Sequence, residues 1–157
     1  MKKYILFAVL TLFTFSIFSQ SSKSYKVLQK LRFTQAADFD ISQPITFNDN
    51  IGWLFINDFK MIFDYYDFNI ISYEEAKNIS LSVNNKYNSL YEIIIRGNTR
   101  PDIGICNGEV PISIYVKIVD LKNDGKLVAS FNFSQGLLEG KCTRNVAEAI
   151  VIKLKEF

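Results

Sequence analysis

The chain has 157 residues, with 18 Lys and Arg side chains against 16 Asp and Glu, a net charge of +2 and no histidine. This length suits one domain with one core, and so small a charge gives no global electrostatic attraction to nucleic acid or an anionic membrane. The missing histidine excludes the Ser-His-Asp and Cys-His catalytic arrangements and any imidazole metal site.

The first residues have the layout of a secretory signal peptide. Lys2 and Lys3 precede an apolar run from 4 to 18, and Ser19 is the small residue expected before a cleavage site. We expect cleavage after Ser19, with a cut after Gln20 as the near alternative. A retained single-span anchor is the other interpretation, although the run is short against the roughly 20 residues of a membrane span. The prediction is a signal peptide over 1–19 and a single globular domain over 20–157.

Cleavage would also change the charge. Losing Lys2 and Lys3 takes the basic side chains from 18 to 16, equal to the 16 acidic ones, all of which follow the cleavage site. No cysteine lies near the junction, which excludes a bacterial lipid anchor on a new N-terminal cysteine. We therefore expect a neutral product with no nucleic-acid partner and no stable membrane anchor.

The N-terminal half of this domain reads as strands and helices in alternation. Residues 25–33 alternate loosely and predict a first strand, 35–44 a connection, and 45–47 a short second strand. Asn48-Asp49-Asn50 offers a cap for a helix that should end near Tyr65-Tyr66. Its aromatic residues, Phe59 and Phe63 among them, are interpreted as core packing, with a ligand pocket as the alternative.

A second helix should follow a turn at 67–69 and a short strand at 70–71. Ser72-x-x-Glu75 is a capping-box pattern, so this helix is expected to start at Tyr73, with its apolar face continuing to Tyr87.

The C-terminal half reads as strands followed by a helix. Residues 90–96 predict a central strand, and 97–111, with Pro101, Gly104 and Gly108, a long loop. Alternation over 112–118 and 127–133 around a turn at 122–125 predicts a hairpin. Thr143 is expected to cap the last helix. The predicted fold is an α/β (α+β) sandwich, a small mixed or antiparallel sheet with a C-terminal hairpin, packed by two or three helices.

Two segments resemble small α/β domains of the bacterial envelope. They are Asp67-Phe68-Asn69-Ile70-Ile71-Ser72-Tyr73-Glu74-Glu75-Ala76 and the hairpin from Val116 to Phe131. A helix, a strand ending near a Ser-x-x-Glu turn and a hairpin of the Val-Asp-x-x-x-Gly-x-Val kind are similar to the N-terminal domain of TolB and to LpoB, over roughly residues 50–157. The resemblance implies binding to other envelope proteins without catalysis. No functional residue carries over, since the 97–111 loop and the cysteines have no counterpart there.

The two cysteines, Cys106 and Cys142, predict one structural disulfide, because an exported chain meets an oxidising compartment. Their spacing is far from Cys-x-x-Cys, so a catalytic redox pair is not expected.

Few routes to catalysis remain. The chain has no phosphate-cradling or dinucleotide-binding glycine motif, and we expect no cofactor and no metal. Paired carboxylates alone can hydrolyse glycosidic bonds, and Asp102, Glu109 and Glu139 are the candidates. A small carboxylate-dependent secreted hydrolase is thus the alternative to a non-enzymatic domain that binds another envelope protein.

A Cys106–Cys142 bond would pin two loops at one end of the sheet, where binding residues concentrate. The candidate binding surface consists of Arg96, Arg100, Asp102, Leu137, Leu138 and Glu139. Two other interpretations stay open: the bond merely staples a long loop, or Leu137 and Leu138 form an apolar patch for self-assembly.

Overall fold

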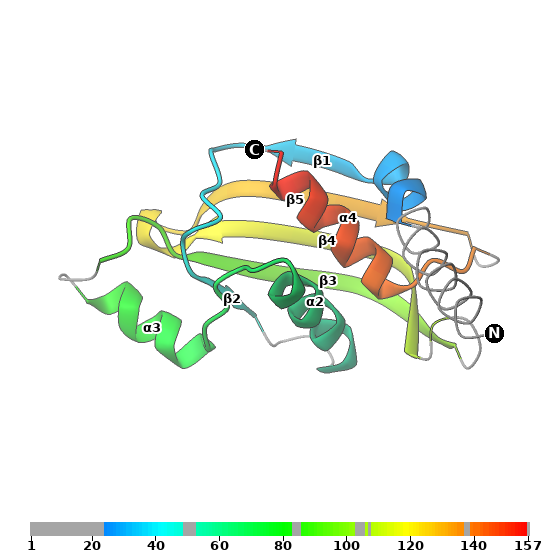
Figure 1. The fold of residues 1–157 in the computed structure, drawn as a ribbon, viewed down its shortest axis with the longest axis horizontal. Helices are drawn as coiled ribbons and strands as arrows, with labels where there is room; N and C mark the ends of the chain where they lie inside the picture. Colours follow the sequence, from blue (N-terminus) through cyan, green and yellow to red (C-terminus); the bar gives the residue numbers. More distant parts are fainter. Residues whose placement is uncertain are drawn as a thin grey trace, which may run out of the picture.

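The computed structural model describes residues 24–48, 53–82, 86–102, 106, 108–136 and 139–156. Their strands form one five-stranded mixed sheet in the order β1-β5-β4-β3-β2, in which β2 and β3 are parallel and the other neighbours antiparallel (Figure 1). The strands are β1 Arg32–Gln35, β2 Ile45–Phe47, β3 Tyr91–Asp102, β4 Gly108–Asp120 and β5 Lys126–Ser134. The predicted signal peptide lies outside the described residues.

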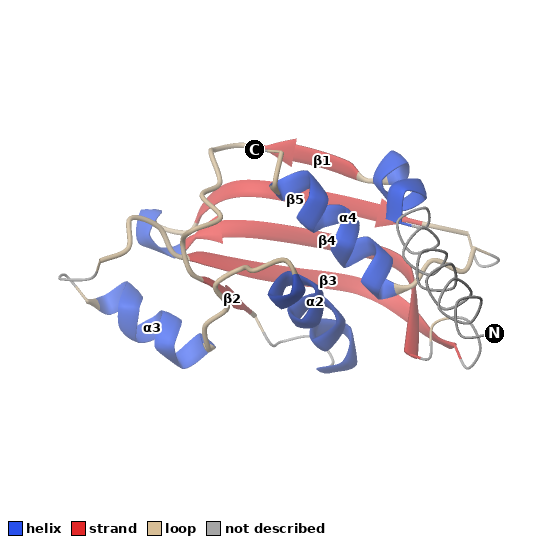
Figure 2. Ribbon diagram, viewed as in Figure 1, coloured by secondary structure: helices blue, strands red, loops and turns tan. Residues whose placement is uncertain are grey.

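Four α-helices accompany this sheet in the described part of the chain. They are a helix that includes residues 24–30, α2 Trp53–Tyr65, α3 Tyr73–Leu81 and α4 Thr143–Leu154. Helices α2 and α4 pack together on one face of the sheet, whereas α3 lies beyond β2 at its end (Figure 2). The predicted α+β fold with a C-terminal hairpin is confirmed. No helix among the described residues is long and apolar enough to cross a membrane.

The core lies between this sheet face and the two helices. Alternate residues Val116 and Ile118 of β4 and Phe131 of β5 are buried there against Val146 and Ile150 of α4. Burying side chains of this kind stabilises by about 1.5–3 kcal/mol each. Apolar side chains recur at every second position of the strands and at every third or fourth position of the helices, and both sets therefore pack into one core layer.

The ends of α2 and α3 largely match the sequence prediction. Helix α2 ends at Tyr65, and the Oγ of Ser72 accepts a hydrogen bond from the backbone N–H of Glu75 at 3.1 Å, capping α3. Phe59 and Phe63 are fully buried, as core packing requires. Helix α3 stops at Leu81, so Tyr87 is not part of it.

The prediction of a strand over 25–33 is wrong. Residues 24–30 are helical and only Arg32–Gln35 forms a strand. Val27 and Leu31, one helical turn apart, are both buried, and Leu31 N–H donates to the carbonyl of Val27 at 2.9 Å. In so short a segment, loose alternation and a four-residue helical spacing are hard to tell apart. Here Val27 and Leu31, four residues apart, pack the helix onto the core.

Two shorter predictions also need correction. Ile70 makes an isolated bridge to Ile45 and no strand forms at 70–71. Helix α4 begins at Thr143, so its N-cap is Cys142 and not Thr143. The side chain of Asn145 accepts a hydrogen bond from the Cys142 N–H at 3.1 Å. Asn145 is the third residue of the helix, and its side chain satisfies the N–H of the N-cap residue, as in a capping box.

The predicted long loop over 97–111 is wrong in its greater part. Strands β3 and β4 continue through it as a hairpin in which Arg100 pairs with Val110, after a bulge between Asn98 and Thr99. Proline removes a ladder donor, and Pro111 lies at this bulge, where the ladder is already interrupted. Composition suggested a loop, whereas the two ends of this segment pair with each other as a hairpin, and this pairing gives the backbone its partners.

A second bulge shifts the pattern of β5. The register of β4 against β5 changes between Ile118 and Val119, so that Val128 is buried and Leu127, expected inside, is only half-buried. The carbonyl of Val128 accepts from the N–H groups of Ala36 and Ala37 at 2.8 and 3.1 Å. This residue therefore fastens the end of β1 to the sheet.

Gly97 permits close contact between the two longest strands. A Cβ added at Gly97 would lie 2.2 Å from the carbonyl oxygen of Ser113 and 3.2 Å from the Cα of Ile114. Both neighbours are backbone atoms, so no side chain can move aside to make room.

We expect Gly97→Ala to lower the free energy of unfolding by about 1–3 kcal/mol, since the strands must separate. Urea denaturation measures this change. Asn98→Ala at the next, exposed position is the matched control and should be nearly neutral. Equal effects at the two positions would contradict the steric argument.

Glu148 of α4 joins three segments. Its Oε1 accepts from the hydroxyl of Tyr66, just after α2, at 2.9 Å, and its Oε2 accepts from the buried hydroxyl of Ser24. Burial of the phenol, together with the bond to Glu148, raises the pKa of Tyr66 to about 12 from an ordinary 10.0. The folded protein therefore holds this proton more tightly than the unfolded chain does.

This difference predicts alkaline sensitivity. The contribution of Tyr66 to stability is complete below its ordinary pKa and is lost as the pH rises through about 12. The difference in unfolding free energy between the wild type and Tyr66→Phe should therefore shrink above about pH 10. Denaturant unfolding of both proteins over that range tests it, and a difference independent of pH would refute the coupling.

Candidate functional site

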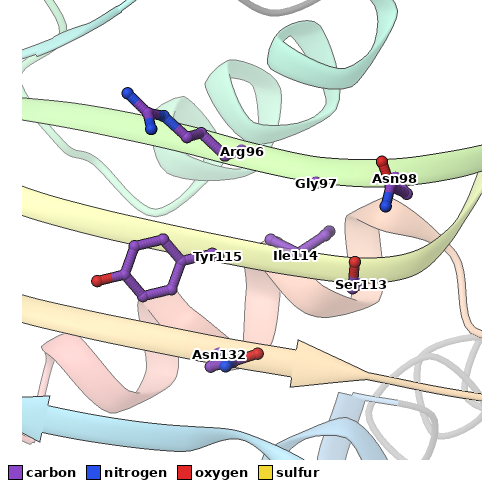
Figure 3. A pocket seen from close by; sticks show the side chains of 7 residues that line it. All are labelled: Arg96, Gly97, Asn98, Ser113, Ile114, Tyr115 and Asn132. Atoms are coloured by element: carbon purple, nitrogen blue, oxygen red, sulfur yellow. The ribbon is translucent and has the colours of Figure 1, made fainter.

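The face of the sheet opposite α2 and α4 carries the candidate site. Paired residues share a face, and the register places Arg96 of β3, Tyr115 of β4 and Asn132 of β5 in one row that ends at Arg32 of β1. Tyr115 is 36% exposed, whereas its neighbours along the strand, Ile114 and Val116, are buried. Figure 3 views this row with the helices behind the sheet.

We call this surface the open face. It comprises Ile94, Arg96 and Asn98 on β3, Ser113, Tyr115 and Lys117 on β4, and Asn132 on β5. Two depressions mark it. A shallow hollow of about 380 Å³ runs from Asn98 past Tyr115 to Asn132 (Figure 3), and a narrower notch of about 110 Å³ lies among Ile94, Arg96, Tyr115 and Lys117.

The open face is cationic. Arg96 pairs directly with Tyr115 across the two strands, and Lys117 lies on the neighbouring rung of the ladder. The Nζ of Lys117 is 5.8 Å from the centre of the Tyr115 ring. The acid nearest along β3, Glu92, is only 8% exposed and accepts a hydrogen bond from the side chain of Asn48 at 2.9 Å. Glu92 is on the same face of β3 as Arg96, but it is almost fully buried, so the exposed charge beside the Tyr115 ring is positive.

Of the residues predicted to bind, Arg96 lies on the open face. Arg100 lies beyond the bulge, half-buried and paired with the buried Val110, and its Nε makes no hydrogen bond to the described residues. Arg100 lines neither depression. The structure thus separates two arginines that composition had placed in one loop.

Glu139 lies elsewhere. Its carboxylate pairs with the Nζ of Lys30 at 2.5 Å, beside the helix at 24–30, and the hydrogen bond from Lys30 holds the pKa of Glu139 below its ordinary value. The side chains of Asp102, Glu109, Leu137 and Leu138 are outside the described residues. The carboxylate hydrolase and the apolar assembly patch therefore remain predictions.

Sequence reasoning missed Tyr115, Lys117 and Asn132 as site residues. Alternation identified Tyr115 and Lys117 as the outward residues of a half-buried strand, and this is confirmed. Alternation does not tell whether a second layer covers the outward face. The signal available was the aromatic residue flanked by a cation two positions away.

The predicted disulfide is confirmed. Cys106 and Cys142 are joined with an S–S distance of 2.07 Å and a Cα–Cα distance of 5.4 Å, linking the tip of the β3–β4 hairpin to the N-terminus of α4. Gln135 supports the same junction: its Nε2 donates to the carbonyls of Pro111 and Lys141, and its Oε1 accepts from Lys141 N–H at 3.1 Å. A structural disulfide fits an extracellular or periplasmic protein.

Metal binding finds no support in the described residues. No group of three or more Cys, Asp or Glu side chains is close enough there to hold an ion.

No protein-family model matches the chain, and no curated protein matches its sequence. Among solved structures it is similar to a substituted PelC from Paraburkholderia phytofirmans, described as a dodecamer, with a TM-score of 0.43 and 10% identity over 76% of this chain and 96% of that one. A second PelC dodecamer gives 0.38 and 9% with the same coverage. Similarity this low supports no statement about partner, assembly or activity. The resemblance to the TolB N-terminal domain and LpoB stays a prediction.

The disulfide should contribute substantially to stability. It closes a loop spanning 36 residues, so replacing both cysteines by serine should lower the free energy of unfolding by about 3–4 kcal/mol. Urea denaturation of the double variant and the wild type measures the loss, and reduction of the wild type should reproduce it. A loss below about 1 kcal/mol would show that Gln135 and the strand ladder hold this junction alone.

Proposed function

We propose that this protein is an exported, non-enzymatic domain that binds another protein of the cell envelope through its open face. The N-terminal segment has the pattern of a secretory signal, and the disulfide suits the compartment that such a signal addresses. The resemblance to small envelope-binding domains points to the same class of function.

The observation that supports this proposal most is the part of the sheet face around Tyr115 that the described residues leave exposed. An antiparallel sheet with one solvated face normally presents scattered polar residues, but here Tyr115 stands between Arg96 and Lys117. Tyrosine and arginine are the residue types enriched where protein interfaces gain most of their energy. The main hollow is shallow, which suits a protein surface better than a small substrate that must be enclosed.

Site-specific photocrosslinking in the protein's own host tests the proposal. A photoreactive residue would replace Tyr115 or Asn132 on the open face, and Met61 on the exposed side of α2 as the matched control. We expect the two open-face positions to crosslink one and the same protein, identified by mass spectrometry. Excess unmodified protein should compete that crosslink away.

Two results would overturn the proposal. One is equal crosslinking from Met61 and from the open face, which indicates collision without a defined surface. The other is a crosslink that excess unmodified protein does not reduce.

A further inference from the structure

We infer that the open face recognises a carboxylate-bearing, partly apolar segment of a partner protein, with the notch between Arg96 and Lys117 receiving a Glu or Asp side chain. This inference rests on the proposed function and adds the chemistry of the partner. It identifies Arg96 and Lys117 as the residues that determine specificity.

The shape and the polar groups of the notch support a carboxylate. Its volume is about 110 Å³, and three of the residues that line it end in polar groups: the guanidinium of Arg96, the ammonium of Lys117 and the phenol of Tyr115. All three are hydrogen-bond donors, and the two cations make charge-assisted bonds to an anion. A guanidinium presents the fork geometry that matches a carboxylate.

Charge complementarity selects the sign of the partner. Arg32 extends the same row on β1, so three cations lie on this side of the sheet, whereas the acid on it, Glu92, is buried and accepts a hydrogen bond from Asn48. The chain beyond residue 19 has equal numbers of acidic and basic side chains. The cationic face is therefore a local concentration of charge and not a reflection of the whole molecule.

Apolar neighbours favour a protein over a polyanion. Along the same face Ile94 pairs with Lys117, and the next rung joins the buried Glu92 to Val119 and Leu127. The apolar side chains of Ile94, Val119 and Leu127 are half-buried. A polymer of phosphates or an anionic membrane surface would leave these side chains without complementary contacts. A protein segment that alternates acidic and apolar residues satisfies both the notch and this apolar strip.

Binding of a synthetic peptide tests the inference directly. The probe is a peptide of alternating Glu and Leu, and its counterpart has Gln in place of every Glu. Isothermal titration calorimetry with the protein produced from the full chain should show binding of the Glu peptide at least tenfold tighter than of the Gln peptide. The difference should narrow as the ionic strength rises.

A charge-matched pair of variants locates the site. Arg96→Gln with Lys117→Gln should weaken Glu-peptide binding by about tenfold or more, because both partners of the carboxylate are lost. Lys26→Gln with Lys77→Gln removes the same charge from exposed positions on two helices away from the open face and should change binding less than twofold. Amide NMR spectra of the wild type should show peptide-induced shifts centred on Tyr115, and this measurement needs no variant.

Three results would overturn the inference. They are equal binding of the Glu and Gln peptides, equal losses in the two double variants, and binding to phosphatidylglycerol vesicles that depends on Arg96 and Lys117 while the peptide does not bind. If the open-face crosslink is nevertheless specific and competed, the proposed function stands and only the acidic chemistry of the partner fails.

Discussion

Cross-strand pairing between β3 and β4 is the constraint on which the rest of this structure depends. These are the two longest strands, of 12 and 13 residues, and they lie in the middle of the sheet. Their ladder sets the face to which each side chain of β3 and β4 belongs, because the pleat alternates strictly between bulges. A slip of β3 by one residue would turn Ile95 outward and Arg96 toward the helices, so the hydrophobic core enforces the register.

The candidate site is a consequence of that register. The same pairing that buries Ile95 and Val116 beneath α2 and α4 brings Arg96 to Tyr115 on the opposite side. The core and the open face are thus the two sides of one strand ladder. The register that places the apolar side chains in the core also places the cations on the open face. Gly97, where an added Cβ would meet the backbone of Ser113, is also one of the residues that line the hollow beside this row.

The far end of the hairpin needs a separate restraint. Beyond the bulge at Asn98 the two strands extend toward the start of α4, and the Cys106–Cys142 bond joins them to it. Gln135 contributes through hydrogen bonds to Pro111, next to the bulge, and to Lys141. A covalent link and a buried amide hold the end of the hairpin, while the aromatic and cationic centre of the open face depends on the ladder alone.

The amino-acid sequence was sufficient wherever a pattern and its physical cause are local. The cap of α3 at Ser72, the end of α2, the alternation of β4 and the turn at 122–125 all follow from neighbouring residues. The cysteine pair followed from composition and compartment. Tertiary structure decided that 24–30 is helical, because Val27 and Leu31 reach the core. It also showed that 97–111 is mostly strand, because the two ends of this segment pair with each other in spite of their glycine and proline content. It also decided which outward face stays uncovered, since alternation along a strand records two faces but not which of them a helix will cover.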